Sequence, residues 1–193
     1  MRIVLASSSP YRRQLLGRLG VAFEVASPDV DETPGPGEQP RDLVLRLANA
    51  KADAVAANRA PSIVIASDQV AAEGARTLGK PGTHERAVAL LGSLSGRTVT
   101  FLTSLLVLNT QTGNRQGHID ETRVHFRELT SEEIERYVAS EQPLDCAGGI
   151  KSEGQGILLC RELATRDPTA LIGLPLIELG RMLRAEGVAF FQT

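Results

Sequence analysis

The sequence contains few of the residues from which disulfide frameworks and zinc centres are built. It has no tryptophan, two cysteines and three histidines, and aromatic residues make up only 4% of the chain. Cys146 and Cys160 match no zinc or redox spacing, so we expect two reduced thiols. The histidines, His84, His118 and His125, show no ligand spacing, since the last two would lie on opposite faces of one strand. The sequence therefore indicates neither a disulfide framework nor a histidine–cysteine metal centre.

Long apolar runs and a surplus of basic residues are also absent. No run approaches the roughly 18 apolar residues of a membrane-spanning helix. The apolar stretch at residues 3–6 is too short for the core of a signal peptide. Twenty-one basic against 23 acidic residues leave a net charge of −2, whereas general nucleic-acid and anionic-membrane binders are usually basic. We therefore expect a cytoplasmic protein with neither a nucleic-acid nor a membrane partner.

The composition that is present is that of a globular domain. The chain has 193 residues, 42% hydrophobic and 23% charged, which is ordinary for a soluble protein. A chain of this length buries about 70% of the surface that its unfolded form exposes, so it needs no covalent or metal staple. Because no repeat, low-complexity tract or linker is visible, we expect a single domain over residues 1–193, which can be divided into two lobes.

Hydrophobic periodicity predicts a mixture of strands and helices. The expected helices cover residues 10–19, 40–58, 83–94, 131–140 and 175–186. The expected strands cover residues 3–6, 63–66, 97–108, 114–127 and 157–163, with a hairpin partner for the second at 69–73 before a turn near Gly74. Residues 27–40 and 145–156 read as loops. Since the elements do not follow a strict βαβ repeat, the predicted fold is α/β, with a mixed central sheet flanked by helices.

Charge is unevenly distributed at the start of the chain. Residues 1–20 contain four arginines and no acid, and residues 21–40 contain five acids and no base. A metal–polyphosphate site would need a cationic patch beside an acidic one. From charge alone, chance clustering on solvated faces is the simpler explanation.

Three serines connect the first strand to the first helix. Ser9 is a suitable N-cap, and Pro10 suits the first helical position. The free N–H groups of a first helical turn favour an anion, and Arg12 and Arg13 add donors that match phosphate oxygens. A capped helix with surface arginines would have the same sequence, so the junction alone does not decide between the two.

Lys51 lies on the apolar face of the second predicted helix. That face is formed by Leu43, Val44, Leu47, Ala54 and Val55, and Lys51 follows Leu47 by four positions. An inward lysine costs desolvation unless an anion meets it. The alternative is that its ammonium reaches solvent past the edge of the helix.

Further polar residues follow buried or stiff segments. Asp68 comes directly after the strand at 63–66, where a carboxylate can orient a metal or deprotonate water. Lys80 lies on a stiff loop between Gly79 and Pro81. The glycine-dense segment 148–156 could let backbone approach a ligand closely, although it is no P-loop, because no glycine directly precedes Lys151. The alternative for Asp68 is that it belongs to an ordinary polar turn without a functional role.

An ordered set of short motifs carries a family resemblance. They run from residue 5 to residue 175: Leu5-Ala6-Ser7-Ser8-Ser9-Pro10-Tyr11-Arg12-Arg13 with Leu15-Leu16, Val30-Asp31-Glu32-Thr33, Ala50-Lys51-Ala52, Ser67-Asp68-Gln69-Val70, Gly79-Lys80-Pro81, Tyr137-Val138, Cys146-Ala147-Gly148, Lys151-Ser152-Glu153-Gly154 and Gly173-Leu174-Pro175. As a set they resemble the Maf family of nucleotide pyrophosphatases over nearly the whole chain.

Three residues resemble those of the branch that hydrolyses 7-methyl-GTP. They are Tyr11, Gln69 and Glu153, where the branch acting on dTTP and UTP typically has Arg, Thr and Gln. Tyr11 stands where tryptophan is more usual. The resemblance thus implies that these residues determine substrate specificity.

The resemblance also implies a fold and a mechanism. The fold would be a mixed α/β domain in two lobes around a cleft, like that of the inosine triphosphate pyrophosphatases. Asp68 would accept a proton from the water that attacks the α-phosphorus, and Glu32 with Asp68 would hold Mg²⁺ or Mn²⁺. The triphosphate would be held by Ser7, Ser9, Arg12, Lys51 and Lys80.

The expected activity is hydrolysis of 7-methyl-GTP to 7-methyl-GMP and diphosphate, with a small-molecule nucleotide as the partner. Two alternatives remain open. One is the same reaction on dTTP, UTP or another modified nucleotide, and the other is a non-catalytic nucleotide-binding regulator of cell division. The sequence leaves the oligomeric state open, with a homodimer as one option.

Overall fold

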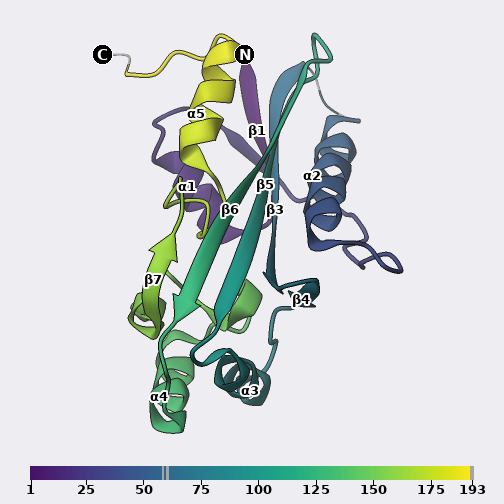
Figure 1. Ribbon diagram of the computed structural model, residues 1–193. Helices are drawn as coiled ribbons and strands as arrows, with labels where there is room; N and C mark the ends of the chain where they lie inside the picture. The colour runs from purple at the N-terminus through teal and green to yellow at the C-terminus, as the bar shows by residue number, and fades with distance from the viewer. Residues whose placement is uncertain (58, 60, 192–193) are drawn as a thin grey trace. The chain divides into compact units, whose positions relative to one another are not determined.

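The computed structural model describes residues 1–57, 59 and 61–191 (Figure 1). Its strands pair in the order β2-β1-β3-β5-β6-β7, and β4 pairs with β3. β1 is parallel to β2 and β3, whereas the pairs β3–β4 and β6–β7 are antiparallel. The strands are β1 (Arg2–Ala6), β2 (Glu24–Ala26), β3 (Ser62–Glu73), β4 (Arg76–Leu78), β5 (Thr98–Asn109), β6 (Arg115–Phe126) and β7 (Cys160–Ala164).

Helices flank this mixed sheet. The α-helices are α1 (Pro10–Gly17), α2 (Pro40–Ala56), α3 (His84–Leu94), α4 (Ser131–Glu141) and α5 (Leu176–Ala185). Two short 3₁₀ helices, η1 (Ala147–Gly149) and η2 (Gln155–Leu159), lie between α4 and β7. The predicted α/β class with a mixed sheet is confirmed. Within the described residues, no helix has both the length and the apolar character needed to cross a membrane.

The chain divides into two compact units. Unit 1 comprises Met1–Asp68, Thr103–Asp120 and Asp167–Thr193, and unit 2 comprises Gln69–Leu102 and Glu121–Arg166. The strands β3, β5 and β6 contribute residues to both.

Unit 1 buries both faces of its parallel strands. Odd-numbered residues such as Ile3 and Leu5 of β1 join a core cluster with side chains from α1 and α5. Even-numbered residues such as Val4 and Ala6 join a second cluster with Ala48, Ala52 and Val55 of α2. Figure 1 shows α2 on one side of β1 and β3, and α1 with α5 on the other. A strand buried on both faces must be apolar throughout, which explains the continuous apolar run at residues 3–6.

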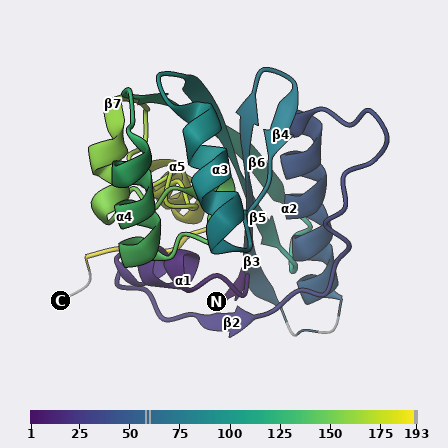
Figure 2. The same cartoon turned by 90° about the horizontal axis from the view of Figure 1, so that it is seen from below.

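Unit 2 is built around α3 and α4, which lie side by side (Figures 1 and 2). Each presents apolar residues to the interior at helical spacing. The buried residues are Ala87, Leu91 and Leu94 from α3, and Ile134, Tyr137 and Val138 from α4. α4 begins with a capping box of Thr130 and Glu133, which was not predicted. Each of the two side chains accepts a hydrogen bond from the backbone N–H of the other residue.

Several local predictions need correction. Residues 69–73 are not a hairpin partner of 63–66, because β3 runs unbroken to Glu73 and its partner is β4, after a turn at Gly74 (φ +60°). Residues 157–159 belong to η2, so the strand predicted at 157–163 starts only at Cys160. Strand β2 was not predicted. The predicted last residue of the second helix, 58, lies outside the described residues, and α2 ends at Ala56.

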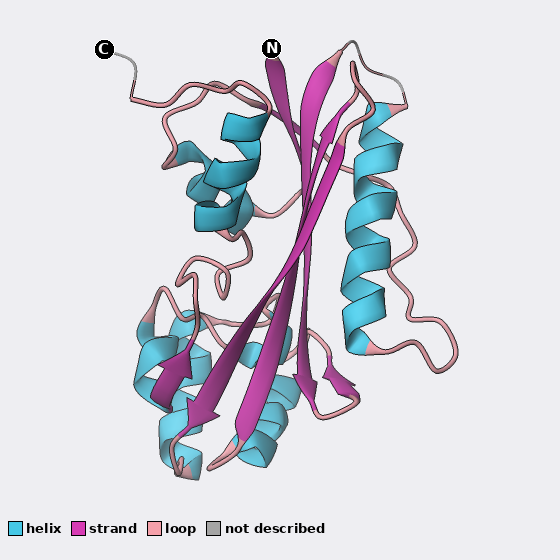
Figure 3. Cartoon of the chain, turned by 45° about the horizontal axis from the view of Figure 1, so that its top comes forward, coloured by secondary structure: helices cyan, strands magenta, loops and turns pink. Residues whose placement is uncertain are grey.

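The predicted loop at 145–156 is wrong in part, since η1 and the start of η2 fall within it. By contrast, the acidic segment between β2 and α2 is irregular, as expected (Figure 3).

Candidate functional site

The junction between β1 and α1 forms a compact polar turn. Ser7 is buried, and its Oγ accepts hydrogen bonds from the Ser9 N–H (3.1 Å) and from Nη1 of Arg12 (3.5 Å). Ser9 caps α1 by accepting from the Arg12 N–H (3.4 Å), and Pro10 occupies the first turn, as predicted. The apolar run of β1 and the capped helix therefore hold both serines where strand meets helix.

A backbone carbonyl from a distant part of the chain orients Arg12. Its Nε donates to the Gly173 carbonyl oxygen (2.9 Å), and Ser67 Oγ donates to the same oxygen (2.9 Å). Gly173 has φ +125°, which L side chains rarely adopt, and a Cβ there would lie 3.4 Å from Arg12 Nε. Burial lowers the pKa of Arg12, while the charges of Asp68 and Glu32 oppose this shift. Gly173 was matched in the sequence only as part of a motif, without a role.

Lys51 points into the protein and meets two carboxylates. Its side chain is only 6% exposed, and its Nζ lies 2.5 Å from Asp68 Oδ1 and 2.6 Å from Glu32 Oε1. The inward position is confirmed and the solvent-reaching alternative is wrong. One member of the predicted apolar face is also wrong: Ala54 is exposed, whereas Ala52 is buried.

Asp68 is held by its backbone as well as by Lys51. It is buried, and its N–H donates to Ser104 Oγ (3.0 Å), which lies 2.8 Å from the Val44 carbonyl oxygen of α2. Ser104, in β5, therefore connects β3 to α2 through hydrogen bonds at the site. Ser104 was not predicted, because it is one of several hydroxyl residues in β5 and nothing in the sequence distinguishes it from them.

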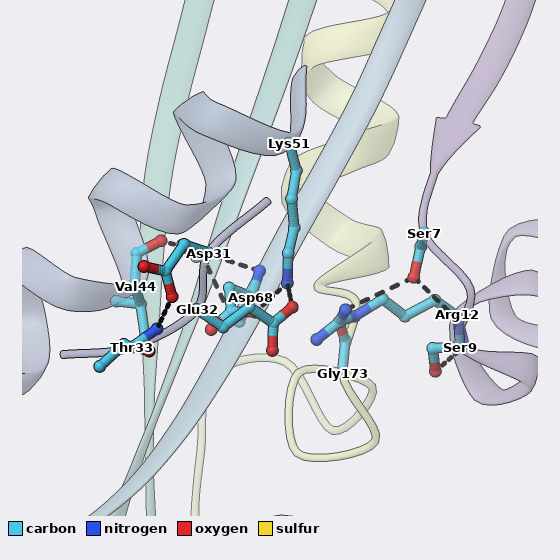
Figure 4. A network of polar contacts seen from close by, with 11 residues as sticks. Ser7, Ser9, Arg12, Asp31, Glu32, Thr33, Val44, Lys51, Asp68 and Gly173 are labelled. Carbon is cyan, nitrogen blue, oxygen red and sulfur yellow. Dashed lines mark hydrogen bonds and ion pairs between the residues drawn. The ribbon is translucent and has the colours of Figure 1, made fainter. Parts of the chain in front are cut away.

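Figure 4 shows how these groups lie together in unit 1. The Lys51 ammonium and the Arg12 guanidinium approach the region of the Asp68 carboxylate from different elements, α2 and α1. Unit 1 thus brings together six of the sequence-predicted site residues: Ser7, Ser9, Arg12, Glu32, Lys51 and Asp68. The arrangement offers cations for an anionic ligand beside carboxylates that can accept a proton.

The remaining predicted residues occupy other positions. Tyr11 is partly buried in α1 of unit 1. Gln69, Lys80 and Glu153 belong to unit 2. Gln69 follows Asp68 directly in β3 and is partly buried, whereas the side chains of Lys80 and Glu153 are exposed.

The glycine-dense segment of unit 2 packs against its own chain. A Cβ on Gly154 would lie 2.8 Å from a Glu141 carboxylate oxygen, and one on Gly156 would lie 2.4 Å from the Lys151 carbonyl oxygen. The Lys151 N–H donates to the Tyr137 hydroxyl (2.8 Å), and burial raises the pKa of that phenol. Close approach within the protein therefore accounts for these two glycines without a ligand.

Glu32 and Asp68 are the two groups on which a divalent cation could be held. Both carboxylates reach one Nζ, so they converge on a single point. Magnesium in phosphate-handling sites is typically bound by one or two carboxylates together with substrate phosphates, and this pair fits that pattern. No cluster of three or more His, Cys, Asp or Glu residues suited to a metal occurs in the described part of the chain.

The cysteines do not form an alternative reactive centre. Neither forms a disulfide in the described part of the chain, and burial raises the pKa of Cys160 to about 11. A thiol with a raised pKa is a poor nucleophile near neutral pH. Both cysteines thus lack a disulfide, as expected.

Comparison with known proteins places this geometry in context. The chain is 57% identical to the 7-methyl-GTP pyrophosphatase of Polaromonas sp. (strain JS666), with 98% of this chain and 86% of that protein aligned. It is 54% identical to the 7-methyl-GTP pyrophosphatase of Aromatoleum aromaticum, over 97% and 96% of the two chains. The protein of the same name from Nitrosococcus oceani is 51% identical, over 96% and 93%.

A solved structure supports the fold. The Ham1 protein of Staphylococcus aureus superposes with a TM-score of 0.51 at 16% identity, covering 96% of this chain and 100% of that one. At this identity the likeness concerns the fold alone. The family described as Maf-like protein matches residues 2–186, and on this match and the three relatives the chain belongs to the Maf-like protein family.

Proposed function

We propose that the protein hydrolyses 7-methyl-GTP to 7-methyl-GMP and diphosphate. The three relatives of this name described above are 51–57% identical over nearly the full chain. The observation that carries the proposal is the buried Lys51–Asp68 ion pair with Glu32 on the same ammonium. A buried charged group is costly without a partner, and a site that keeps both signs of charge in a protected position is suited to phosphoryl chemistry.

The cationic groups would hold the triphosphate. Arg12 is pre-oriented by Gly173 and Ser7, and a fixed guanidinium binds phosphate oxygens with two donors. Ser7 and Ser9 would add hydroxyl contacts at the N-terminus of α1, where the free N–H groups favour an anion. From the family resemblance, Lys80 of unit 2 would contribute a further cation.

Asp68 would act as the general base. A water molecule attacks the α-phosphorus, its proton passes to the Asp68 carboxylate, and the bond to the bridging oxygen breaks with diphosphate as the leaving group. Lys51 pairs with Asp68 Oδ1 at 2.5 Å. An incoming triphosphate competes for the ammonium, so transfer of Lys51 to a phosphate oxygen would leave the Asp68 carboxylate available to accept the proton of the attacking water.

Glu32 and Asp68 would hold Mg²⁺ or Mn²⁺ against the triphosphate. When bound, such a cation neutralises the charge that develops on the phosphate oxygens. Glu32 is the more accessible of the two, with a side chain 54% exposed against 10% for Asp68. Glu32 is therefore the carboxylate that a hydrated cation would meet first.

The base would be selected by an aromatic ring and a carboxylate. Methylation at N7 leaves the guanine ring with a positive charge, which stacks well on an electron-rich face such as Tyr11. Glu153 would accept hydrogen bonds from the N–H edge of the base, and Gln69 would add a neutral contact. These assignments follow the resemblance to the 7-methyl-GTP branch.

Two alternative functions can be distinguished from this proposal by experiment. The same site chemistry would serve dTTP, UTP or another modified nucleotide, and a regulator would bind a nucleotide without turnover. The deciding experiment measures diphosphate release from a panel of 7-methyl-GTP, GTP, dTTP and UTP with Mg²⁺, with Mn²⁺ and with a chelator. Fastest release from 7-methyl-GTP supports the proposal, and binding without diphosphate release contradicts it. Sedimentation of the same sample tests for a homodimer.

A further inference from the structure

We propose that Arg46 and Glu38 form a clamp that positions Glu32 for the reaction. The inference rests on the proposed function, in which Glu32 helps to hold the metal–triphosphate group. Arg46 would act through Glu32 and is therefore a positioning residue. All of these residues belong to unit 1.

The loop that carries Glu32 has almost no apolar anchoring. Residues 31–37 are all exposed, and the segment 34–37 reads Pro-Gly-Pro-Gly. Burial of apolar surface is the main force that orders a segment against its conformational entropy. Since that force is missing here, polar contacts must determine where Glu32 lies.

The clamp provides these contacts from α2. Arg46 Nε donates to Glu38 Oε1 (2.7 Å), and Nη2 donates to Glu38 Oε2 (2.9 Å) and to the Thr33 carbonyl oxygen (3.0 Å). The Gly35 N–H donates to Glu38 Oε2 (2.8 Å). The Arg46 guanidinium lowers the pKa of Glu38 to about 2, so the pair stays ionised at any physiological pH. A two-pronged Arg–carboxylate pair fixes orientation as well as distance.

Two side chains of one helix thus hold consecutive loop residues. Lys51 holds the carboxylate of Glu32 (2.6 Å), and Arg46 holds the carbonyl of the next residue, Thr33. The Thr33 N–H is also engaged, because it donates to Asp31 Oδ1 (2.9 Å). Both backbone groups of Thr33 are therefore fixed, and the direction in which the Glu32 side chain leaves the loop is fixed with them.

The clamp would matter most when substrate is bound. In the proposed mechanism Lys51 turns from the carboxylates to a phosphate oxygen, so Glu32 loses its contact with the helix. The Arg46 contacts do not involve the substrate and persist. They would then keep the Glu32 carboxylate at the site while Lys51 is engaged elsewhere.

The test is whether the effect of Arg46 depends on Glu32. Arg46→Lys keeps the charge but cannot make the two-pronged contact. We expect it to lower kcat/KM about tenfold in the wild-type background, as for coupled residues in one network, and by less than about twofold in a Glu32→Gln background. Arg181→Lys, a matched change at an exposed ion pair on α5, should leave kcat/KM unchanged. An equal loss in both backgrounds would mean a general structural role and would overturn the clamp.

A second measurement is independent of activity. Hydrogen exchange at the Thr33 and Gly35 amides, resolved by NMR, should accelerate about tenfold in both Arg46→Lys and Glu38→Gln, and not in Arg181→Lys. If the wild type releases no diphosphate from any nucleotide, the proposed function fails, and exchange still decides whether the clamp orders the loop. Unchanged exchange in both variants overturns the clamp whatever the activity.

Discussion

Two predicted site residues of unit 1, Lys51 and Asp68, differ sharply in burial from two of unit 2, Lys80 and Glu153. In unit 1, Lys51 and Asp68 form an ion pair and are only 5% and 7% exposed as whole residues. In unit 2, Lys80 and Glu153 are exposed. Removing one member of a buried ion pair leaves the other charge buried without its partner and destabilises the fold. An exposed side chain can be replaced with little effect on stability. Activity and stability should therefore be coupled for variants of Lys51 and Asp68 and separate for variants of Lys80 and Glu153.

The largest effect is expected at Asp68. Asp68→Asn removes the proposed base while keeping the size of the side chain, and loss of a general base typically lowers the rate by about 10²–10⁴-fold. We expect a folded protein with kcat reduced within that range, measured by diphosphate release. Asp53→Asn, at an exposed carboxylate of α2, is the control and should retain activity. Near-normal turnover by folded Asp68→Asn would remove the mechanism.

Lys51→Ala tests the coupling directly. It should lower kcat/KM about 100-fold, because a cation for the triphosphate is lost. It also leaves Asp68 buried without its partner, which costs about 3 kcal/mol at the lower end for a broken buried pair. For a chain of this size we expect Tm to fall by roughly 5–10 °C.

Calorimetry and kinetics on one sample of Lys51→Ala check both parts. Arg181→Ala, at an exposed cation of α5, should change neither. A loss of activity with no change in Tm would show that burial of the pair does not couple stability to function in unit 1.

Glu153→Gln tests whether an exposed site residue of unit 2 can be replaced with an effect on activity and none on stability. If Glu153 balances the charge of the methylated base, wild type should prefer 7-methyl-GTP over GTP by about ten- to a hundredfold, since a hydrogen bond to a charged group contributes about 1.5–3 kcal/mol. The variant should narrow that ratio and keep the wild-type Tm. Glu132→Gln, an exposed carboxylate of α4, should leave the ratio intact. Equal kcat/KM for the two nucleotides in wild type would refute the base assignment and leave the pyrophosphatase proposal standing.

The smallest effect is expected at the capping box of unit 2. The Arg127 side chain, followed by the Thr130 N–H and hydroxyl, lowers the pKa of Glu133 from 4.5 to about 2. A lowered folded-state pKa stabilises the fold above pH 4.5, and this contribution is lost as pH falls from 4.5 towards 2. Glu133→Gln keeps the capping hydrogen bond without the charge. Urea unfolding should therefore depend less steeply on pH in that window for the variant, and an unchanged dependence would contradict the assignment.

The local elements could be predicted from short-range rules. Ser9 and Pro10 start α1, and apolar spacing placed α3 and α4 within a residue or two. The error at β3 has a physical cause. β3 was divided in two because Ser67, Asp68 and Gln69 interrupt its apolar run, yet β1 pairs with residues 62–66 and β4 pairs with residues 71–73 of one continuous strand. Pairing with other strands overrode the local pattern.

The site was predictable as a set of residues and not as an arrangement. Spacing along α2 was enough to turn Lys51 inward, and the ordered motifs were enough to name Asp68 and Glu32. No sequence pattern indicated a role for Ser104 or Arg46, because hydroxyl residues in strands and arginines on helices are common in any chain. Their roles depend on what faces them.

The sequence by itself determined where the α-helices and the strands β1, β5 and β6 form, that Lys51 faces inward on α2 and which family the chain resembles. These depend on periodicity, capping and motif order, all of which act over a few residues. Tertiary structure alone decided that Lys51 meets two carboxylates at once and that one carbonyl holds Arg12 and Ser67 from 161 and 106 positions away. Such contacts arise only when the parallel strands and the helices on both their faces are packed, since burial there leaves each polar group to find a partner inside the protein.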